Sequence, residues 1–180
     1  MRIIAGCYRG QRLKAVPGIN TRPTADKIKG AIFNVLREKI EGARVLDLFS
    51  GTGNLALEAL SRGAKEAVLI EKNRTAQGII RENMEHLGIE NAKLLAMDAF
   101  TYLEQHEEEL FDIIFIDPPY HQGLVEKSLK LLAHPCRLTY TGVIIVETAK
   151  DETLAEYKPF EVKKTGTYGD TKIWYLQRME

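Results

Sequence analysis

The sequence predicts an α/β fold built on a mostly parallel sheet of seven strands, with helices on both faces. Short apolar runs without polar alternation recur along the chain, which is typical of strands that are buried on both sides. Helical patterns separate the first five of these runs, as parallel strands joined by crossovers require. The last two runs have no helix-length pattern between them and are therefore expected to form an antiparallel hairpin.

The first elements form a basic extension ahead of this sheet. Residues Arg2–Ala5 resemble a short strand and Tyr8–Gly10 a turn, so a hairpin or an extended arm is expected. Thr24 is a suitable N-cap for a helix, and apolar side chains then recur at helical spacing up to Leu36. Gly42 ends that pattern.

The core alternates strands and helices in a regular order. The expected strands of the parallel part are 45–48, 67–70, 93–97, 112–116 and 143–146. The expected helices are 54–61, 74–87, a short acidic helix reaching 108, and 124–132. The hairpin strands are expected at 160–163 and 172–176, with residues 163–171 as a loop because they contain two glycines.

Size and composition limit the possible classes of protein. A chain of 180 residues suits one domain, which we divide into the extension at 1–42 and a catalytic core at 43–180. Neither a membrane-spanning run nor a secretory signal is evident, which predicts a cytoplasmic protein. Cys7 and Cys136 are too few for a disulfide framework, and since no histidine pair has the spacing of metal ligands we expect no metal.

Charge is distributed unevenly although the formal net charge is zero. Residues 1–40 carry nine Lys or Arg against two Asp or Glu, and the remaining 140 residues carry sixteen against twenty-three. Such a basic segment favours contact with the phosphates of a nucleic acid. A solvated charged surface is the ordinary alternative.

The first predicted parallel strand leads into a glycine-containing loop that opens a helix. Glycines let a backbone approach a ligand closely, and cofactors bind at the carboxyl ends of strands in open α/β sheets. The candidate cofactor-binding residues of this loop are Asp47, Phe49, Gly51 and Gly53. With Ala56, the two glycines also fit the dinucleotide fingerprint, so this loop alone does not choose between cofactors.

Two further acids follow predicted strands. Glu71 is placed to accept hydrogen bonds from ribose hydroxyls, as in both nicotinamide and adenosylmethionine enzymes. Asp98 can accept a bond from an adenine amino group while Met97 and Ala99 pack on the ring. Considered alone, Asp98 is more simply an acid in a surface turn.

The fourth parallel strand is followed by Asp117, Pro118, Pro119 and Tyr120. Two prolines cannot continue a central strand, so they predict a stiff loop. The Asp117 carboxylate and the Pro118 carbonyl can bind the two N–H groups of an exocyclic base amine and direct its lone pair at a sulfonium methyl. Tyr120 can stack on the base. A structural turn with a core tyrosine is the alternative.

These motifs together resemble class I methyltransferases that act on base amines. The resemblance is carried by Asp47-x-x-x-Gly51-x-Gly53, Glu71, Asp98 and Asp117-Pro118-Pro119-Tyr120. Nearly the whole chain is further similar to the bacterial small-subunit rRNA guanine-N2 methyltransferases of the RsmD family. That similarity is carried by Ile3–Gly6, Arg9-Gly10, Arg22-Pro23-Thr24-x-Asp26, Phe33-Asn34-x-Leu36 and residues 53–64.

The resemblance implies a Rossmann-like class I methyltransferase fold, S-adenosyl-L-methionine as cofactor and a monomeric enzyme. The implied substrate is N2 of one guanine in 16S rRNA, on a small ribosomal subunit or an assembly intermediate. Asp117 and the loop behind it would handle the amine, and the strand-end acids and loop glycines would contact the cofactor. The implied RNA contacts lie in the basic extension, at Arg9, Arg12, Arg22 and Thr24.

Three other functions remain open on the sequence. A DNA or RNA adenine-N6 methyltransferase is the nearest, because the loop beginning at Asp117 serves that reaction too. A nicotinamide oxidoreductase would use the glycine fingerprint and Glu71 but leaves that loop and the basic extension without a purpose. A non-catalytic RNA-binding assembly factor would keep the basic extension and need no methyl donor.

Overall fold

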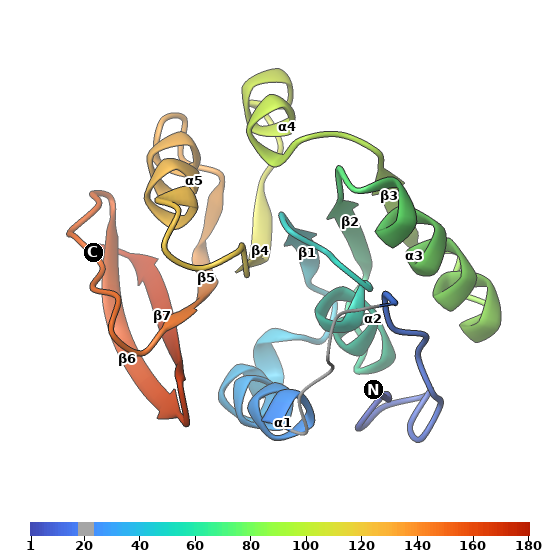
Figure 1. Ribbon diagram of the computed structural model, residues 1–180. Helices are drawn as coiled ribbons and strands as arrows, with labels where there is room; N and C mark the ends of the chain where they lie inside the picture. Colours follow the sequence, from blue (N-terminus) through green and yellow to red (C-terminus); the bar gives the residue numbers. More distant parts are fainter. Residues whose placement is uncertain (18–23) are drawn as a thin grey trace.

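Seven strands form one sheet in the order β3-β2-β1-β4-β5-β7-β6 in the computed structural model, which describes residues 1–17 and 24–180 (Figure 1). The strands are β1 (Arg44–Asp47), β2 (Glu66–Ile70), β3 (Ala92–Leu95), β4 (Phe111–Ile116), β5 (Leu138–Ala149), β6 (Phe160–Tyr168) and β7 (Thr171–Arg178). The first five pair in parallel, whereas β7 runs antiparallel to both β5 and β6.

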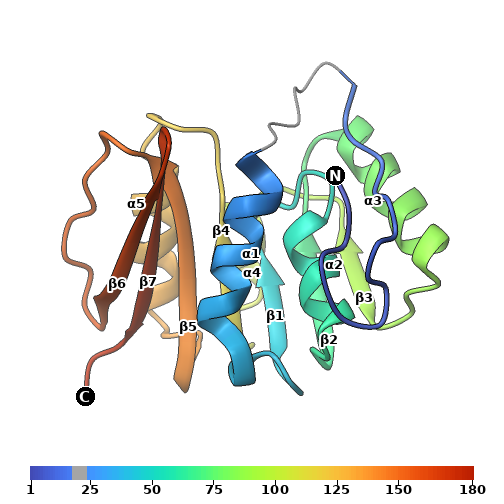
Figure 2. The same cartoon turned by 90° about the horizontal axis from the view of Figure 1, so that it is seen from below.

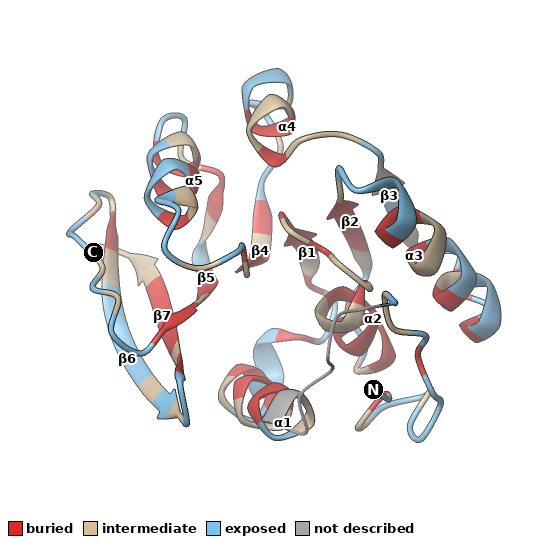
Figure 3. Cartoon of the chain, viewed as in Figure 1, coloured by how far each residue is buried: buried red, intermediate tan, exposed pale blue. Residues whose placement is uncertain are grey.

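Helices cover both faces of this sheet (Figures 1 and 2). They are α1 (Thr24–Leu36), the short 3-10 helix η1 (Arg37–Lys39), α2 (Asn54–Ser61), α3 (Arg74–Leu87), α4 (Ala99–Gln105) and α5 (Leu124–Ala133). Apolar side chains of α1, α2 and α3 pack into one buried cluster, and those of α4 and α5 pack into another. The sheet therefore separates two cores, as the buried strands in Figure 3 show.

The central strand β4 explains why the apolar runs lack polar alternation. Ile113 and Phe115 point into the α1 side of the sheet, while Ile114 and Ile116 point into the α5 side. Both faces of the strand are thus buried, so every position from Ile113 to Ile116 is apolar. The predicted α/β fold with a mostly parallel sheet is confirmed.

Helix boundaries agree with the predicted ranges where local signals mark them. In α3, the Asn73 side chain accepts a hydrogen bond from the Ala76 amide at 3.0 Å, and Gly88 ends the helix in a left-handed conformation. The expected ranges 54–61 and 74–87 are confirmed. The acidic helix, by contrast, ends at Gln105 and does not reach 108.

The predicted hairpin is present, but the predicted loop at 163–171 is wrong. Strand β6 continues to Tyr168, and only Gly169 and Asp170 form the turn. Strand β6 lies at the edge of the sheet, and the polar side chains in its middle are exposed to solvent. Strand β5 is likewise longer than the predicted 143–146, and the third strand ends at Leu95 rather than at residue 97.

The basic extension is anchored to the core by buried charges. Residues 7–10 form the expected turn, but the expected strand at 2–5 is reduced to one antiparallel bridge between Arg2 and Arg12. Glu58 on α2 accepts the Ile4 amide at 2.9 Å and the Ala5 amide at 3.1 Å. Side-chain acceptors thus replace a strand partner for this part of the backbone.

Among the helices in the described part of the chain, none combines the length and apolar character needed to cross a bilayer.

Candidate functional site

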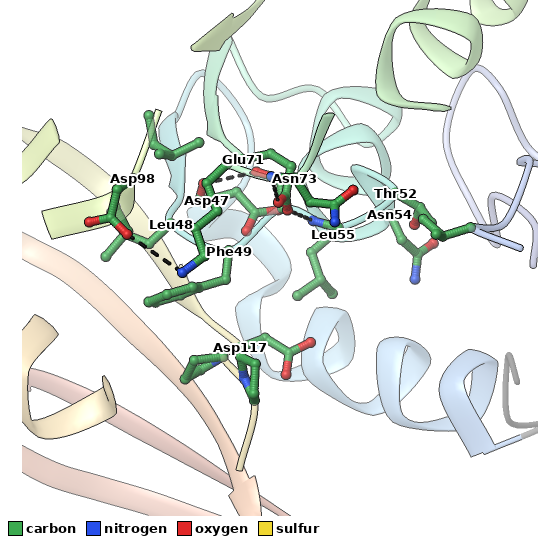
Figure 4. Close-up of a pocket in the computed structure, with 18 of the residues that line it drawn as sticks. Asp47, Leu48, Phe49, Thr52, Asn54, Leu55, Glu71, Asn73, Asp98 and Asp117 are labelled. Atoms are coloured by element: carbon green, nitrogen blue, oxygen red, sulfur yellow. Dashed lines mark hydrogen bonds and ion pairs between the residues drawn. The ribbon is translucent and has the colours of Figure 1, made fainter. Parts of the chain in front are cut away.

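A cavity of about 590 Å³ lies at the carboxyl ends of the central strands (Figure 4). Its walls come from the glycine loop after β1, the acids after β2 and β3, and the loop after β4. The residues among these that the sequence singled out are Asp47, Phe49, Gly51, Glu71, Met97, Asp98, Ala99, Asp117, Pro118 and Pro119. Four motifs that are far apart in the sequence therefore meet in one cavity.

The glycine loop and the acid after β2 are joined by direct hydrogen bonds. Glu71 accepts the Gly51 amide at 2.8 Å through Oε2 and the Asn73 amide at 2.7 Å through Oε1. Gly53 has a φ of 80°, and a Cβ there would come within 3.2 Å of Leu69 Cδ2. The loop thus needs glycine for its backbone conformation and for its close packing against β2.

Asp47 is buried at the floor of the cavity, with only 1% of its surface exposed. Burial, followed by the charge of Glu71, raises the pKa of Asp47 to about 7, while the Phe49 and Ala56 amides act in the opposite direction. Within the described residues, its Oδ1 atom is buried and has no hydrogen-bond partner. A buried acceptor of this kind suits a ligand that brings a donor or a positive charge.

Asp98 has a structural role as well as a place in the cavity. Its Oδ1 caps α4 by accepting the Phe100 amide at 2.9 Å, and Lys72 Nζ lies 3.8 Å from its Oδ2. The ring of Phe49 contacts Phe100 edge-on, with centroids 6.2 Å apart. The cap fixes this acid at the rim of the cavity. Its contact with an adenine stays a prediction.

The double-proline loop brings Asp117 to the side of the cavity opposite Glu71 and Asp98 (Figure 4). Burial raises the pKa of Asp117 well above its usual range, and the nearby negative charges of Glu147 and Asp47 raise it further. Pro118 is buried, whereas Pro119 is exposed. The loop therefore holds an electrostatically perturbed carboxyl group next to the glycine loop.

Tyr120 occupies a different position from its three neighbours. Its hydroxyl donates to Glu147 Oε1 at 2.6 Å and lies 3.2 Å from Thr171 Oγ1. It lines a second cavity of about 150 Å³ that adjoins the first, because Pro118 and Pro119 line both. These bonds tie the double-proline loop to β5 and β7, and stacking of Tyr120 on a base stays a prediction.

The basic extension supplies one wall of the larger cavity. Met1 and Val16 line it. The buried side chain of Asn83 on α3 accepts the Lys14 amide at 2.7 Å and donates to the Thr52 carbonyl at 3.1 Å. One amide group therefore connects the extension to the glycine loop.

The predicted RNA contacts are only partly described. Arg9 and Arg12 are exposed on the extension. Arg22 lies outside the described residues, and Thr24 is the first residue of α1, with its side chain also outside the described set. Among the described side chains, no group of three His, Cys, Asp or Glu could hold a metal ion.

Glu147, which lines the smaller cavity, and Asn83, which bonds to the glycine loop, are two polar residues that the sequence analysis missed. Glu147 follows the apolar run of β5 in the same way that Glu71 follows that of β2, so the strand-end rule could have found it. Asn83 carries no such signal, because a buried asparagine in the middle of a helix is recognised only from its partners.

Comparisons with known proteins agree with this arrangement. A family model described as "Conserved hypothetical protein 95" matches residues 1–177. The chain is 35% identical over 172 residues to ribosomal RNA small subunit methyltransferase D of Haemophilus influenzae, covering 94% of this chain and 89% of the relative. The solved structure of the Escherichia coli protein yhhF has a TM-score of 0.87 at 34% identity, covering 99% of this chain and 97% of that one.

A more distant structure shows how widely the fold is shared. The ribosomal protein L11 methylase of Lactobacillus delbrueckii subsp. bulgaricus has a TM-score of 0.66 at 21% identity, covering 83% of this chain and 77% of that one. At this identity the likeness concerns the fold, which is that of class I methyltransferases.

Proposed function

This chain belongs to the Conserved hypothetical protein 95 family, also known as the RsmD family of methyltransferases, and from that premise we propose that it methylates N2 of a guanine in 16S rRNA. The observation that carries the proposal is the presence of Asp117 in the same cavity as the glycine loop and the three other strand-end acids. The proposed binding site for the methyl donor and the proposed amine-binding loop would thus be adjacent. A methylated ribosomal RNA is also what the name of the Haemophilus relative states for that protein.

The residues of the larger cavity fit S-adenosyl-L-methionine, which supplies an electrophilic methyl group when bound. The unpartnered oxygen of Asp47 suits a cationic or donor group of this ligand. Gly51 has open space where a Cβ would stand, so its backbone lies bare toward the cavity. Glu71 stands at the end of β2, where an acid binds ribose hydroxyls in related folds.

The double-proline loop would position the base amine. An exocyclic amine is a weak nucleophile because its lone pair is delocalised into the ring. The Asp117 carboxylate and the Pro118 carbonyl can bind its two N–H groups, which directs the lone pair at the methyl carbon. The gain comes from orientation and electrostatics in a partly buried site.

The target base has to leave its stack to reach this loop, since the cavity cannot admit a paired base. The exposed arginines of the basic extension, Arg9 and Arg12, would hold the surrounding phosphates. We propose a small ribosomal subunit or an assembly intermediate as substrate, a monomeric enzyme and a cytoplasmic site of action.

Methyl transfer followed by nucleoside analysis tests this function. Tritiated methyl groups would be transferred to small ribosomal subunits lacking the modification, to naked rRNA and to DNA. We expect N2-methylguanosine to dominate in the small-subunit RNA, and the Asp117→Ala variant to give background counts. N6-methyladenine as the main product would overturn the guanine assignment.

Isothermal titration separates the proposed enzyme from the other function classes. We expect submicromolar binding of adenosylhomocysteine and no response to NADH. The reverse pattern would indicate an oxidoreductase. An Asp117→Ala protein that supports ribosome assembly as well as the wild type would instead favour a non-catalytic assembly factor.

A further inference from the structure

Two carboxylates follow the last residue pair of the β4–β5 ladder. The two strands are parallel neighbours, and their register pairs Phe115 with Ile145 and Ile116 with Val146. Asp117 and Glu147 are the next residues on the two strands. Neighbouring strands lie about 4.8 Å apart, so this register sets the two side chains next to each other.

Alternation along the strands places both acids on the same side of the sheet. Phe115 and Ile145 belong to the buried cluster on the α1 side, and a residue two positions further along a strand points the same way. The charge of Glu147 is the strongest of the neighbouring charges that raise the pKa of Asp117. Register, alternation and electrostatics therefore agree that the two carboxylates form a pair.

The pair stands at the boundary between the two cavities. Asp117 lines the larger cavity, Glu147 lines the smaller one, and Pro118 and Pro119 line both. A planar ring at this boundary, beside Pro118 and Pro119, would have Glu147 on the side of the smaller cavity and Asp117 on the side of the larger one. An exocyclic amine on the edge of the ring that faces Asp117 would reach the larger cavity, where the proposed function places the methyl donor.

We propose that Glu147 selects guanine by accepting a hydrogen bond from its N1–H group while Asp117 binds the neighbouring N2 amine. This inference rests on the proposed function, which it deepens by assigning the smaller cavity to the base. Guanine carries donors at both N1 and N2, so its edge matches two adjacent acceptors. Adenine has a donor only at N6, and its N1 is an acceptor that would face a carboxylate.

The bond to Tyr120 is compatible with this role. The Tyr120 hydroxyl donates to Oε1 of Glu147, and a carboxylate can accept several hydrogen bonds at once. A hydrogen bond to a charged group changes discrimination by roughly 10- to 100-fold, which sets the size of the expected effect.

The test replaces the target guanine by 2-aminopurine, which keeps the N2 amine but has an acceptor at N1. Small subunits would be reconstituted around 16S rRNA carrying either base at the position that the wild-type enzyme methylates. We expect the wild type to prefer guanine by at least about 10-fold in kcat/KM. Glu147→Gln can donate to the 2-aminopurine N1, so we expect its preference to fall by about 10-fold or more.

Three matched measurements keep the result interpretable. Glu104→Gln removes a carboxylate from the exposed side of α4 and should keep the wild-type preference. Tyr120→Phe removes the hydrogen bond to Glu147 but leaves the charge of Glu147 in place. This variant should also keep the preference for guanine. Adenosylhomocysteine binding verifies that each variant is folded, and the ratio of two substrates does not depend on the fraction of active enzyme.

The possible outcomes separate this inference from the proposed function. If Glu147→Gln keeps the wild-type preference, or Tyr120→Phe loses it to the same degree, Glu147 does not read the base and the inference is wrong. If the wild type methylates no guanine N2 at all, the proposed function itself has failed.

Discussion

Burial raises the pKa of the Asp117 carboxyl, and the charges of two nearby carboxylates, Glu147 and Asp47, raise it further. In the free protein this arrangement is unfavourable for a negative charge, and it becomes favourable when N–H donors arrive. We expect Asp117→Ala to reduce methyl transfer by at least about 100-fold, because amine orientation and electrostatic stabilisation are both lost. Adenosylhomocysteine affinity, measured by titration calorimetry, should stay within about 3-fold of the wild type.

Asp47 predicts a pH dependence of cofactor binding. Its pKa of about 7 means that the group gains its charge between pH 6 and pH 8. If it binds a cationic group of the ligand, affinity for adenosylhomocysteine should rise over that interval. Calorimetry at three pH values would measure the slope, and Asp47→Asn should make it flatter. An unchanged slope in the variant would assign the titration to another group.

The same residue predicts how stability changes with pH. Since the pKa of Asp47 is raised from its ordinary value of 3.8 to about 7, the native state keeps a proton that the unfolded chain releases at lower pH. Its contribution to stability is therefore fully present below about pH 4 and is lost as pH rises through 7. The stability of Asp47→Asn relative to the wild type should increase as the pH is raised from 5 to 8. Urea midpoints measured across this range would show the increase.

Among single residues, the sequence predicted the positions of the strand-end acids better than it predicted the position of Tyr120. Asp47, Glu71 and Asp117 follow apolar runs, and strand ends meet at one edge of a parallel sheet, so their proximity could be derived. The position of the Tyr120 ring could not, because it depends on Glu147 and Thr171 from two other strands.

Helix α1 and helix α2 are joined by a buried ion pair that also anchors the basic extension. Lys29 Nζ lies 3.1 Å from Glu58 Oε2 and donates to the Asn54 side chain at 2.7 Å, and both ionic side chains are almost fully buried. Burial lowers the pKa of Lys29 despite this partner. The pair thus depends on its full set of hydrogen bonds.

We expect Lys29→Met to lower the free energy of unfolding by about 3–5 kcal/mol, since it leaves Glu58 buried with fewer partners. Chemical denaturation would measure the loss. Lys27→Met, at an exposed position of the same helix, should have little effect. Adding Glu58→Gln to Lys29→Met should recover part of the loss, and strictly additive losses would contradict a coupled pair.

Elements with local signals were predictable, and elements defined by their neighbours were not. Helix α3 has an asparagine cap and a closing glycine, and its predicted bounds are confirmed. Strand β6 carries Lys163, Lys164 and Gly166, which indicate a loop when considered alone. It is a strand because β7 supplies a ladder of partners along one side, and that pairing leaves no trace in the composition of β6.

For the whole molecule, the separation of charge predicts how RNA binding responds to salt. The formal net charge is zero, so attraction to RNA must come from a local basic surface. Reversing both Arg9 and Arg12 to Glu should weaken RNA binding and reduce the slope of log affinity against log salt by about 0.7 or more per lost phosphate contact. Filter binding across a salt series would measure this slope.

The matched control lies on the other face of the sheet. Lys130 is exposed on α5, away from the extension, so Lys130→Glu changes the net charge without touching the proposed RNA surface. It should leave the slope nearly unchanged. Lys130→Glu changes the net charge by half as much as the double reversal. If its effect on the slope is also half as large, RNA is attracted by overall charge and the extension has no special part in binding.

The strand order has a consequence for how the sheet is completed during synthesis. Strand β7 lies between β5 and β6, although β6 precedes it in the chain. The nascent protein therefore makes its edge strand before it makes the strand that attaches that edge to the rest. A chain stopped at Tyr168 would contain every residue of β6 and yet have nowhere to place it. Thr171, which contacts Tyr120, would be missing as well, so the loop after β4 would lose one of its supports at the same time.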